Sequence, residues 1–81
     1  MNEKIHIGKL ILQKLKEQER SIAWLAKKVD CDRNNFRKLL KGNYINTPLL
    51  FRISAAMDID FFSFYSEQLR TLKENEVNFT S

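Results

Sequence analysis

The sequence predicts an all-α domain of five short helices, and three observations lead to this fold class. Apolar residues recur at helical spacing along almost the whole chain. Only two glycines and one proline are present, too few for the many tight turns of a β fold. The chain has 81 residues, 43% of them hydrophobic and 30% charged, which is typical of one globular domain. We expect this domain over residues 1–72 and a frayed tail over residues 73–81.

The first two expected helices each carry one apolar stripe. The first covers about residues 5–18. The second follows Ser21, whose hydroxyl can accept a backbone N–H as the N-cap. It ends near Asp30, a residue type that tolerates left-handed backbone, so a tight turn is expected there. The buried positions are Ile7, Leu10, Ile11 and Leu15 in the first helix and Ile22, Leu25, Ala26 and Val29 in the second.

The third expected helix has two chemically different faces. It covers about residues 32–41, with Asp32 as its cap and Gly42 as its stop. At about 100° per residue, one arc holds the apolar side chains Phe36, Leu39 and Leu40. The opposite arc holds long hydrogen-bond donors, with Asn35 at its edge: Arg33, Asn34, Arg37, Lys38 and Lys41. The sequence therefore predicts one core face and one donor face.

The rest of the chain predicts two more helices. Thr47 is expected to cap the fourth, with Pro48 in its first turn, and Asp60 to cap the fifth. The stretch FFSFY at the start of the fifth helix is mainly expected in the core. So many large side chains in so few residues cannot all face one core, however. Three of them are candidates for a dimer interface, namely Phe61, Phe64 and Tyr65.

The second and third helices, joined by about three residues, are arranged as in a helix-turn-helix motif. In that motif the second helix of the pair lies in the DNA major groove. Arginine and lysine donate to the acceptor edge of guanine, and asparagine pairs with adenine. Backbone N–H groups near Ser21 suit a phosphate. A net charge of +4 and a pI of about 9.4 agree with a nucleic-acid partner but are weak evidence alone.

The segment SIAWLAKKVDCDRNNFRKLLKGN resembles the helix-turn-helix of the Xre (Cro/repressor-type) DNA-binding family. The features that carry the resemblance are the serine before Leu25–Ala26, the polar stretch 33–35, the inward Phe36 and the KG at 41–42. The later LLFRISAAMDIDFF is similar to the family's fourth helix and the start of its fifth. The WLA and DFF tripeptides resemble small regulators of this type from Bacteroides-like bacteria.

The resemblance implies a bacterial transcriptional regulator that binds double-stranded DNA. A homodimer through the surplus aromatic side chains would suit a palindromic site with half-sites about 34 Å apart. The resemblance also implies that Arg33, Asn34 and Lys38 face bases and that Asn35 and Arg37 reach bases or flanking phosphates. Contacts with the DNA backbone would come from Ser21, Asn43 and Tyr44. Lys41 is also expected to contact the DNA backbone, because it lies at the end of the helix. Three residues depart from the family's pattern. Ile22 replaces a frequent glutamine, Leu40 a frequent glutamate and Asp30 a frequent turn glycine.

Other interpretations of these residues remain open. The donor face could be a solvated helix surface, as most charged faces are. The chain could also be a protein-interaction module or an antitoxin that uses the aromatic C-terminal helix and binds DNA weakly or not at all. Trp24 lies off the apolar stripe of its helix and is expected to pack against a neighbouring helix, with a phosphate contact or a dimer surface as the alternatives.

Several classes of function have no support in the sequence. No cluster of cysteine, histidine and carboxylate residues has the spacing of metal ligands, so we expect no metal site. No set of residues provides both a nucleophile with its base and a pocket, so we expect no enzyme, cofactor or small-molecule ligand. His6 is expected at the surface or as a cap, and Cys31 as a turn residue. One cysteine, no membrane-length apolar run and no secretory signal favour a cytoplasmic protein.

Overall fold

The computed structural model describes residues 5–75, which form five α-helices and no strand. This confirms the expected all-α, five-helix fold class. The helices are α1 (Ile7–Glu17), α2 (Ile22–Lys28), α3 (Arg33–Gly42), α4 (Thr47–Met57) and α5 (Phe62–Asn75). Helix α3 packs against α1 and α2, and α2 also packs against α4.

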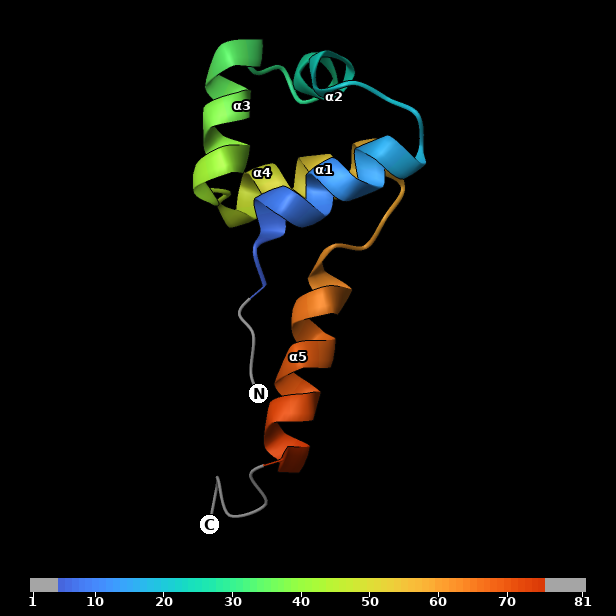
Figure 1. Ribbon diagram of the computed structural model, residues 1–81, viewed down its shortest axis with the longest axis vertical. Coiled ribbons are helices and arrows are strands. Elements are labelled where there is room, and N and C mark those ends of the chain that lie inside the picture. The colour runs from blue at the N-terminus through green and yellow to red at the C-terminus, as the bar shows by residue number, and fades with distance from the viewer. Residues whose placement is uncertain (1–4, 76–81) are drawn as a thin grey trace.

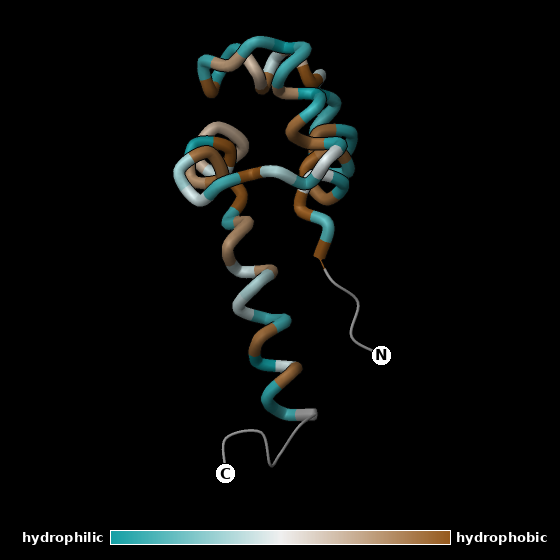
Figure 2. The backbone as a smooth tube through the Cα atoms, turned by 90° about the vertical axis from the view of Figure 1, so that its left-hand side faces the viewer, coloured by the Kyte–Doolittle hydropathy of each residue, from teal (hydrophilic) through white to brown (hydrophobic). Residues whose placement is uncertain are grey.

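Helix α5 projects from the compact unit that α1 to α4 form (Figure 1). The molecule therefore measures 46 × 21 × 21 Å, with a radius of gyration of 14.5 Å. A compact chain of this length would have a radius of gyration of about 12 Å. Apolar and polar segments alternate along the projecting helix (Figure 2), so its apolar side chains extend beyond the core of the main unit.

One hydrophobic core joins the first four helices to the start of the fifth. Phe36 and Phe61 are its largest side chains, and both are fully buried. Leu10 and Ile22 were expected to be buried, but both are only partly buried at the margin of the core. The core residues are Ile7, Ile11, Leu15, Leu25, Ala26, Val29, Phe36, Leu40, Leu50, Ile53, Met57 and Phe61.

Polar side chains cap the first three helices as the sequence leads one to expect. His6 Nδ1 accepts the Lys9 N–H at 3.2 Å at the start of α1. Ser21 Oγ accepts the Trp24 N–H at 3.0 Å at the start of α2. Asp32 Oδ2 accepts the Asn35 N–H at 3.0 Å at the start of α3. The sequence thus located the starts of α2 and α3 correctly, whereas α1 begins at Ile7, two residues after the expected start at residue 5.

The expected start of α4 and the expected end of α3 were each wrong by one residue. Asn46, not Thr47, caps α4, because its Oδ1 accepts the Leu49 N–H at 2.9 Å and Thr47 is already helical. Gly42 does not stop α3 but is its last residue. Asn43 takes the left-handed conformation at φ 61°, and the Tyr44 N–H then donates to Leu39 O at 2.9 Å. An asparagine at this position gives the same left-handed cap that glycine usually provides.

Helices α1 and α3 meet at Gly8, where the two backbones come close together. A Cβ atom on Gly8 would lie 1.8 Å from Leu40 O, so only glycine fits there. The Gly8 N–H also donates to Asn43 Oδ1 at 3.3 Å. These two features hold α3 against the start of α1 and fix which side of α3 remains exposed.

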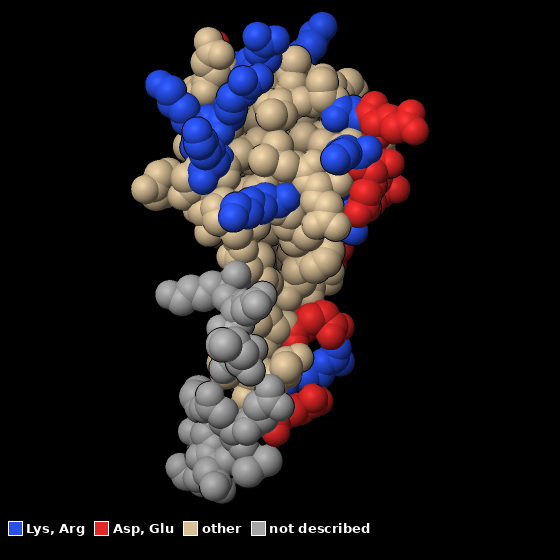
Figure 3. Space-filling model, viewed as in Figure 1, with Lys and Arg blue, Asp and Glu red and all other residues tan. Residues whose placement is uncertain are grey.

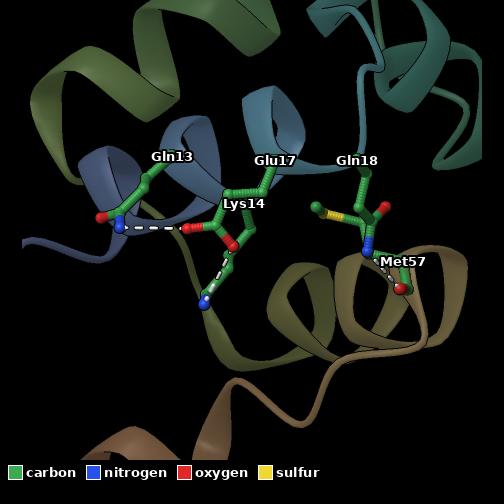
Figure 4. A network of polar contacts seen from close by, with 5 residues as sticks. All are labelled: Gln13, Lys14, Glu17, Gln18 and Met57. Carbon is green, nitrogen blue, oxygen red and sulfur yellow. Dashed lines mark hydrogen bonds and ion pairs between the residues drawn. The ribbon is translucent and has the colours of Figure 1, made fainter.

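Gln18 joins the end of α1 to the end of α4. Its Nε2 donates to Met57 O at 3.0 Å, a carbonyl with no partner further along α4 (Figure 4). On the exposed side of α1, Glu17 accepts from Gln13 Nε2 at 3.2 Å and pairs with Lys14 Nζ at 3.3 Å. Lys14 and Glu17 of α1 are therefore paired within the helix.

The start of α5 contradicts one expected partner contact. Phe61 is 0% exposed and belongs to the core, so it is not available for a dimer interface. Its ring centroid lies 6.0 Å from that of Phe64, which is half-buried. Asp60 Oδ1 accepts the Phe62 N–H at 3.1 Å, but α5 begins at Phe62, so Asp60 lies one residue before the cap position that the sequence assigned to it. Helix α5 continues to Asn75, beyond the expected domain end at residue 72. Residues 76–81 of the expected tail lie outside the described residues.

Candidate nucleic-acid interface

One face of α3 consists of exposed polar side chains, as the helical periodicity predicts. The burial of Phe36 and Leu40 determines this orientation, because both side chains are inserted into the core. Leu39 is half-buried at the boundary. All the residues expected to read bases are exposed, together with the lysine near the end of the helix: Arg33, Asn34, Asn35, Arg37, Lys38 and Lys41.

The cations of this face have no partner within the described residues. Neither a hydrogen bond nor an ion pair involves the side chains of Arg33, Arg37, Lys38 or Lys41 there, and the same is true of the Asn34 amide. The amide of Asn35 makes one long contact, from Nδ2 to Cys31 Sγ at 4.0 Å. The donors are therefore free to bind acceptors outside the chain.

Helix α3 contains no acidic residue between Arg33 and Gly42. The nearest carboxylate, on Asp32, is held at the start of the helix by the Asn35 N–H. In Figure 3 the Lys and Arg side chains gather over α3, while most of the Asp and Glu side chains lie at the opposite edge and along α5. The surface around α3 is therefore predominantly cationic, which attracts polyanions.

The connection from α2 to α3 is short and well ordered by backbone contacts. Asp30 adopts the left-handed conformation at φ 57°, as expected for this turn, and the Cys31 N–H donates to Ala26 O at 2.8 Å. Three residues after Asp30, Arg33 begins α3, so the donor face starts directly at the turn. The end of α2 therefore lies next to the end of α3 that carries Arg33 and Asn34.

The residues expected to contact phosphates fall into two separate places. Lys41, Asn43 and Tyr44 lie together at the end of α3, and Tyr44 is 74% exposed. The Asn43 side-chain oxygen Oδ1 accepts from the Gly8 N–H, which leaves the side-chain NH₂ of Asn43 as a donor. Ser21 lies apart from them, at the exposed start of α2, where its oxygen caps the helix.

Sequence reasoning missed two cations beside Trp24. The Arg20 guanidinium lies 4.1 Å from the centroid of the Trp24 ring, and Lys28 Nζ lies 5.8 Å from it. Trp24 itself is half-buried against the core, in agreement with its expected packing role. The spacing of four residues between Arg20, Trp24 and Lys28 is the signal that could have revealed this stack.

The expected dimer residues lie on α5, apart from α3. Phe64 is half-buried, and Lys14 Nζ lies 5.9 Å from its ring centroid. Tyr65 is 40% exposed, and Leu69, which the sequence did not single out, is 52% exposed. Of the three expected residues only Tyr65 offers a substantial surface to a partner.

Within residues 5–75, no group of three or more histidine, cysteine, aspartate or glutamate side chains is arranged to hold a metal ion. None of the described helices is long and apolar enough to cross a membrane. Comparison of the chain with protein-family models, with curated proteins and with solved structures finds no match in any of the three.

Proposed function

We propose that this protein is a sequence-specific DNA-binding regulator of the Xre (Cro/repressor) type that reads the major groove with α3. The observation that carries the proposal is the donor face of α3. It consists of exposed Arg, Lys and Asn side chains that, apart from the long contact of Asn35 with Cys31, have no partner within the described residues. Such side chains match the acceptor-rich edges of base pairs in the major groove.

The alternative of a merely solvated helix surface agrees less well with the charge pattern. Solvated helices commonly pair their cations with acids three or four residues away. Helix α1 does so with Lys14 and Glu17, and α5 does so with Glu67 and Arg70. Helix α3 has four cations in ten residues and no acid to pair with them. This contrast between helices of one chain favours an external anion as the partner of α3.

The residues near the start of α3 and those that flank the helix have different tasks. Arg33, Asn34 and Lys38 read bases, with Asn35 and Arg37 at bases or flanking phosphates, because the start of such a helix enters the groove deepest. Lys41, Asn43, Tyr44 and Ser21 bind the phosphate backbone and set the register of the protein on the duplex. Two copies would bind inverted half-sites about 34 Å apart. In this proposal the protein acts in the bacterial cytoplasm without a cofactor.

Selection from random duplex DNA at near-physiological salt tests the proposal directly. The expected result is an enriched motif whose affinity falls with salt, with a slope of about −0.9 for each phosphate neutralised. Arg37→Ala should reduce this slope, whereas Lys73→Ala on α5 removes the same charge away from α3 and should leave it unchanged. If no motif is enriched from a folded sample, the proposal fails.

A second candidate function is supported by the exposed apolar side chains of α5. Tyr65 and Leu69 are 40% and 52% exposed, so this helix could bind a partner protein, as in an interaction module or an antitoxin. Salt distinguishes the two functions, because binding through an apolar surface responds little to ionic strength and DNA binding responds steeply.

A further inference from the structure

An apolar hollow lies on the surface where the end of α4 meets the start of α5. It is open and has a volume of about 450 Å³. Ala55, Ile59 and Phe62 contribute to its lining, and Phe51 projects beside them with 67% of its surface exposed. The connection from α4 to α5 lies at the opposite end of α4 from α3 (Figure 1), so the hollow is separate from the proposed DNA-binding surface.

The charged side chains that line this hollow are carboxylates. Asp58 has no side-chain partner within the described residues, and Asp60 uses one oxygen to accept the Phe62 N–H. A second hollow of about 440 Å³ continues from Asp60 and Phe62 along α5, and the arginine that lines it, Arg70, is paired with Glu67. Although the whole chain has a net charge of +4, this part of the surface is therefore acidic.

The carboxylate of Asp58 is not needed to end α4. Asp58 has left-handed backbone at φ 57°, and Asn43 ends α3 in the same conformation without a charge. The helix dipole disfavours a carboxylate at the end of a helix and favours a cation there, yet the last turn of α4 has no basic residue. The end of α4 and Asp58 together thus attract a cation that the described part of the chain does not supply.

We propose that the hollow binds a basic amphipathic segment of another protein. A large apolar side chain of that segment fills the hollow beside Phe51, and a neighbouring lysine or arginine pairs with Asp58. The apolar contact supplies most of the affinity, and the charge pair selects a basic partner and orients it. The inference goes beyond the proposed DNA binding and does not depend on it.

Other occupants agree less well with this surface. Sites for small molecules bury most of the ligand, whereas this hollow is open. Unpaired carboxylates repel nucleic acids. A second copy would have to supply an unpaired cation from the same patch, and Arg70 is already paired with Glu67. The exposed apolar side chains of Tyr65 and Leu69 on α5 form a different surface, which has no requirement for a basic partner.

Phage display of random short peptides against the full chain tests the proposal. The surface has fewer residues than the about 20–30 that a stable interface takes from each partner, so we expect dissociation constants in the micromolar to millimolar range. Enriched peptides should combine a large aliphatic or aromatic side chain with a neighbouring lysine or arginine. Titration of an enriched peptide, followed by NMR, should shift the amide signals of Ala55, Asp58 and Ile59. No enrichment, or enriched peptides without a basic residue, would overturn the proposal.

Two pairs of variants test the charge and the apolar contact separately. Asp58→Asn keeps a residue suited to the left-handed cap and should weaken binding of the enriched peptide about three- to fivefold. Glu74→Gln removes an exposed carboxylate further along α5 and should leave binding unchanged. Phe51→Ser should weaken binding at least about tenfold, as expected for an aromatic anchor. Leu69→Ser removes an exposed apolar side chain outside the hollow and should have no effect.

Two outcomes of these measurements would contradict the proposal. If Asp58→Asn binds the peptide as tightly as the original chain, with its fold intact by circular dichroism, the hollow does not select a basic partner. Sedimentation velocity without peptide tests for a second copy. Self-association that Phe51→Ser abolishes would assign the hollow to a second copy and overturn the proposal.

Discussion

Replacing Gly8 with alanine should destabilise the protein more than any other single methyl addition in α1. The added Cβ would lie 1.8 Å from Leu40 O, 2.7 Å from Leu40 C and 3.0 Å from Leu40 Cα. All three are backbone atoms of α3, so no side-chain rotation can relieve the contact. The carbonyl oxygen would have to move by about 1.2 Å to reach even the 3.0 Å that real Cβ atoms keep. Helices α1 and α3 must therefore separate.

The separation has two costs and one small compensation. Overpacking of a core contact costs about 1–3 kcal/mol. The hydrogen bond from Gly8 N–H to Asn43 Oδ1, now 3.3 Å, would be lost as well, at about 1 kcal/mol. Alanine regains up to about 1 kcal/mol of helix propensity. The net loss is about 1–3 kcal/mol, which lowers the melting temperature of an 81-residue domain by roughly 5–20 °C.

Thermal unfolding followed by circular dichroism measures this effect, with Gly42→Ala as the matched control. A Cβ on Gly42 would meet the Tyr44 ring at 2.5 Å, but that side chain is exposed and can rotate away. Gly42→Ala should therefore change the melting temperature little. If the two variants melt alike, the close approach of α1 and α3 does not limit stability and the reasoning is wrong.

Three further predictions concern single side chains. Asn34→Ala should relax sequence preference without a large loss of total affinity, and unchanged discrimination in a binding-site selection would contradict its base-reading role. Lys41→Ala should weaken all DNA sites alike and reduce the salt slope by about one phosphate; a sequence-dependent loss would contradict its phosphate role. Glu19→Gly should raise stability by about 1 kcal/mol, because Glu19 has φ 57° and its Cβ strains the left-handed backbone. Urea unfolding would measure the gain, and no gain would argue against that strain.

The apolar periodicity was sufficient to predict five helices and most of the core. The pattern works because each helix buries a single stripe, and Ile7, Ile11 and Leu15 in α1 show this directly. The donor face of α3 followed from the same periodicity, since fixing Phe36 and Leu40 inward leaves only the polar arc outside. The N-caps Ser21 and Asp32 could also be predicted, because each has a side-chain oxygen on a short side chain that accepts a backbone N–H.

What the sequence could not predict depends on contacts between distant residues. Gly8 and Asn43 are 35 positions apart, and nothing local reveals that the two residues join α1 to α3. The burial of Phe61 likewise depends on how α5 leaves the main unit. Left-handed backbone at Glu19 was missed because glutamate does not mark a helix end, and at Asp58 it was missed although aspartate gave the same signal there as at Asp30.

The start of α3 gives a last test, because its sequence is unfavourable for helix stability. Arg33 is the first residue of the helix, where the helix dipole disfavours a cation by about 0.3–1 kcal/mol. It also lies one turn before Arg37, and such like-charge pairs cost about 0.2–0.5 kcal/mol. Arg33→Glu reverses both effects and should raise the free energy of unfolding by about 1 kcal/mol at low salt. The same change places a carboxylate where the proposal puts DNA bases, so specific binding should be lost. Thermal unfolding and DNA titration of one sample would compare both quantities. A variant that is more stable and still binds its site would show that Arg33 belongs to a solvated surface. Arg33 would then have no part in base recognition.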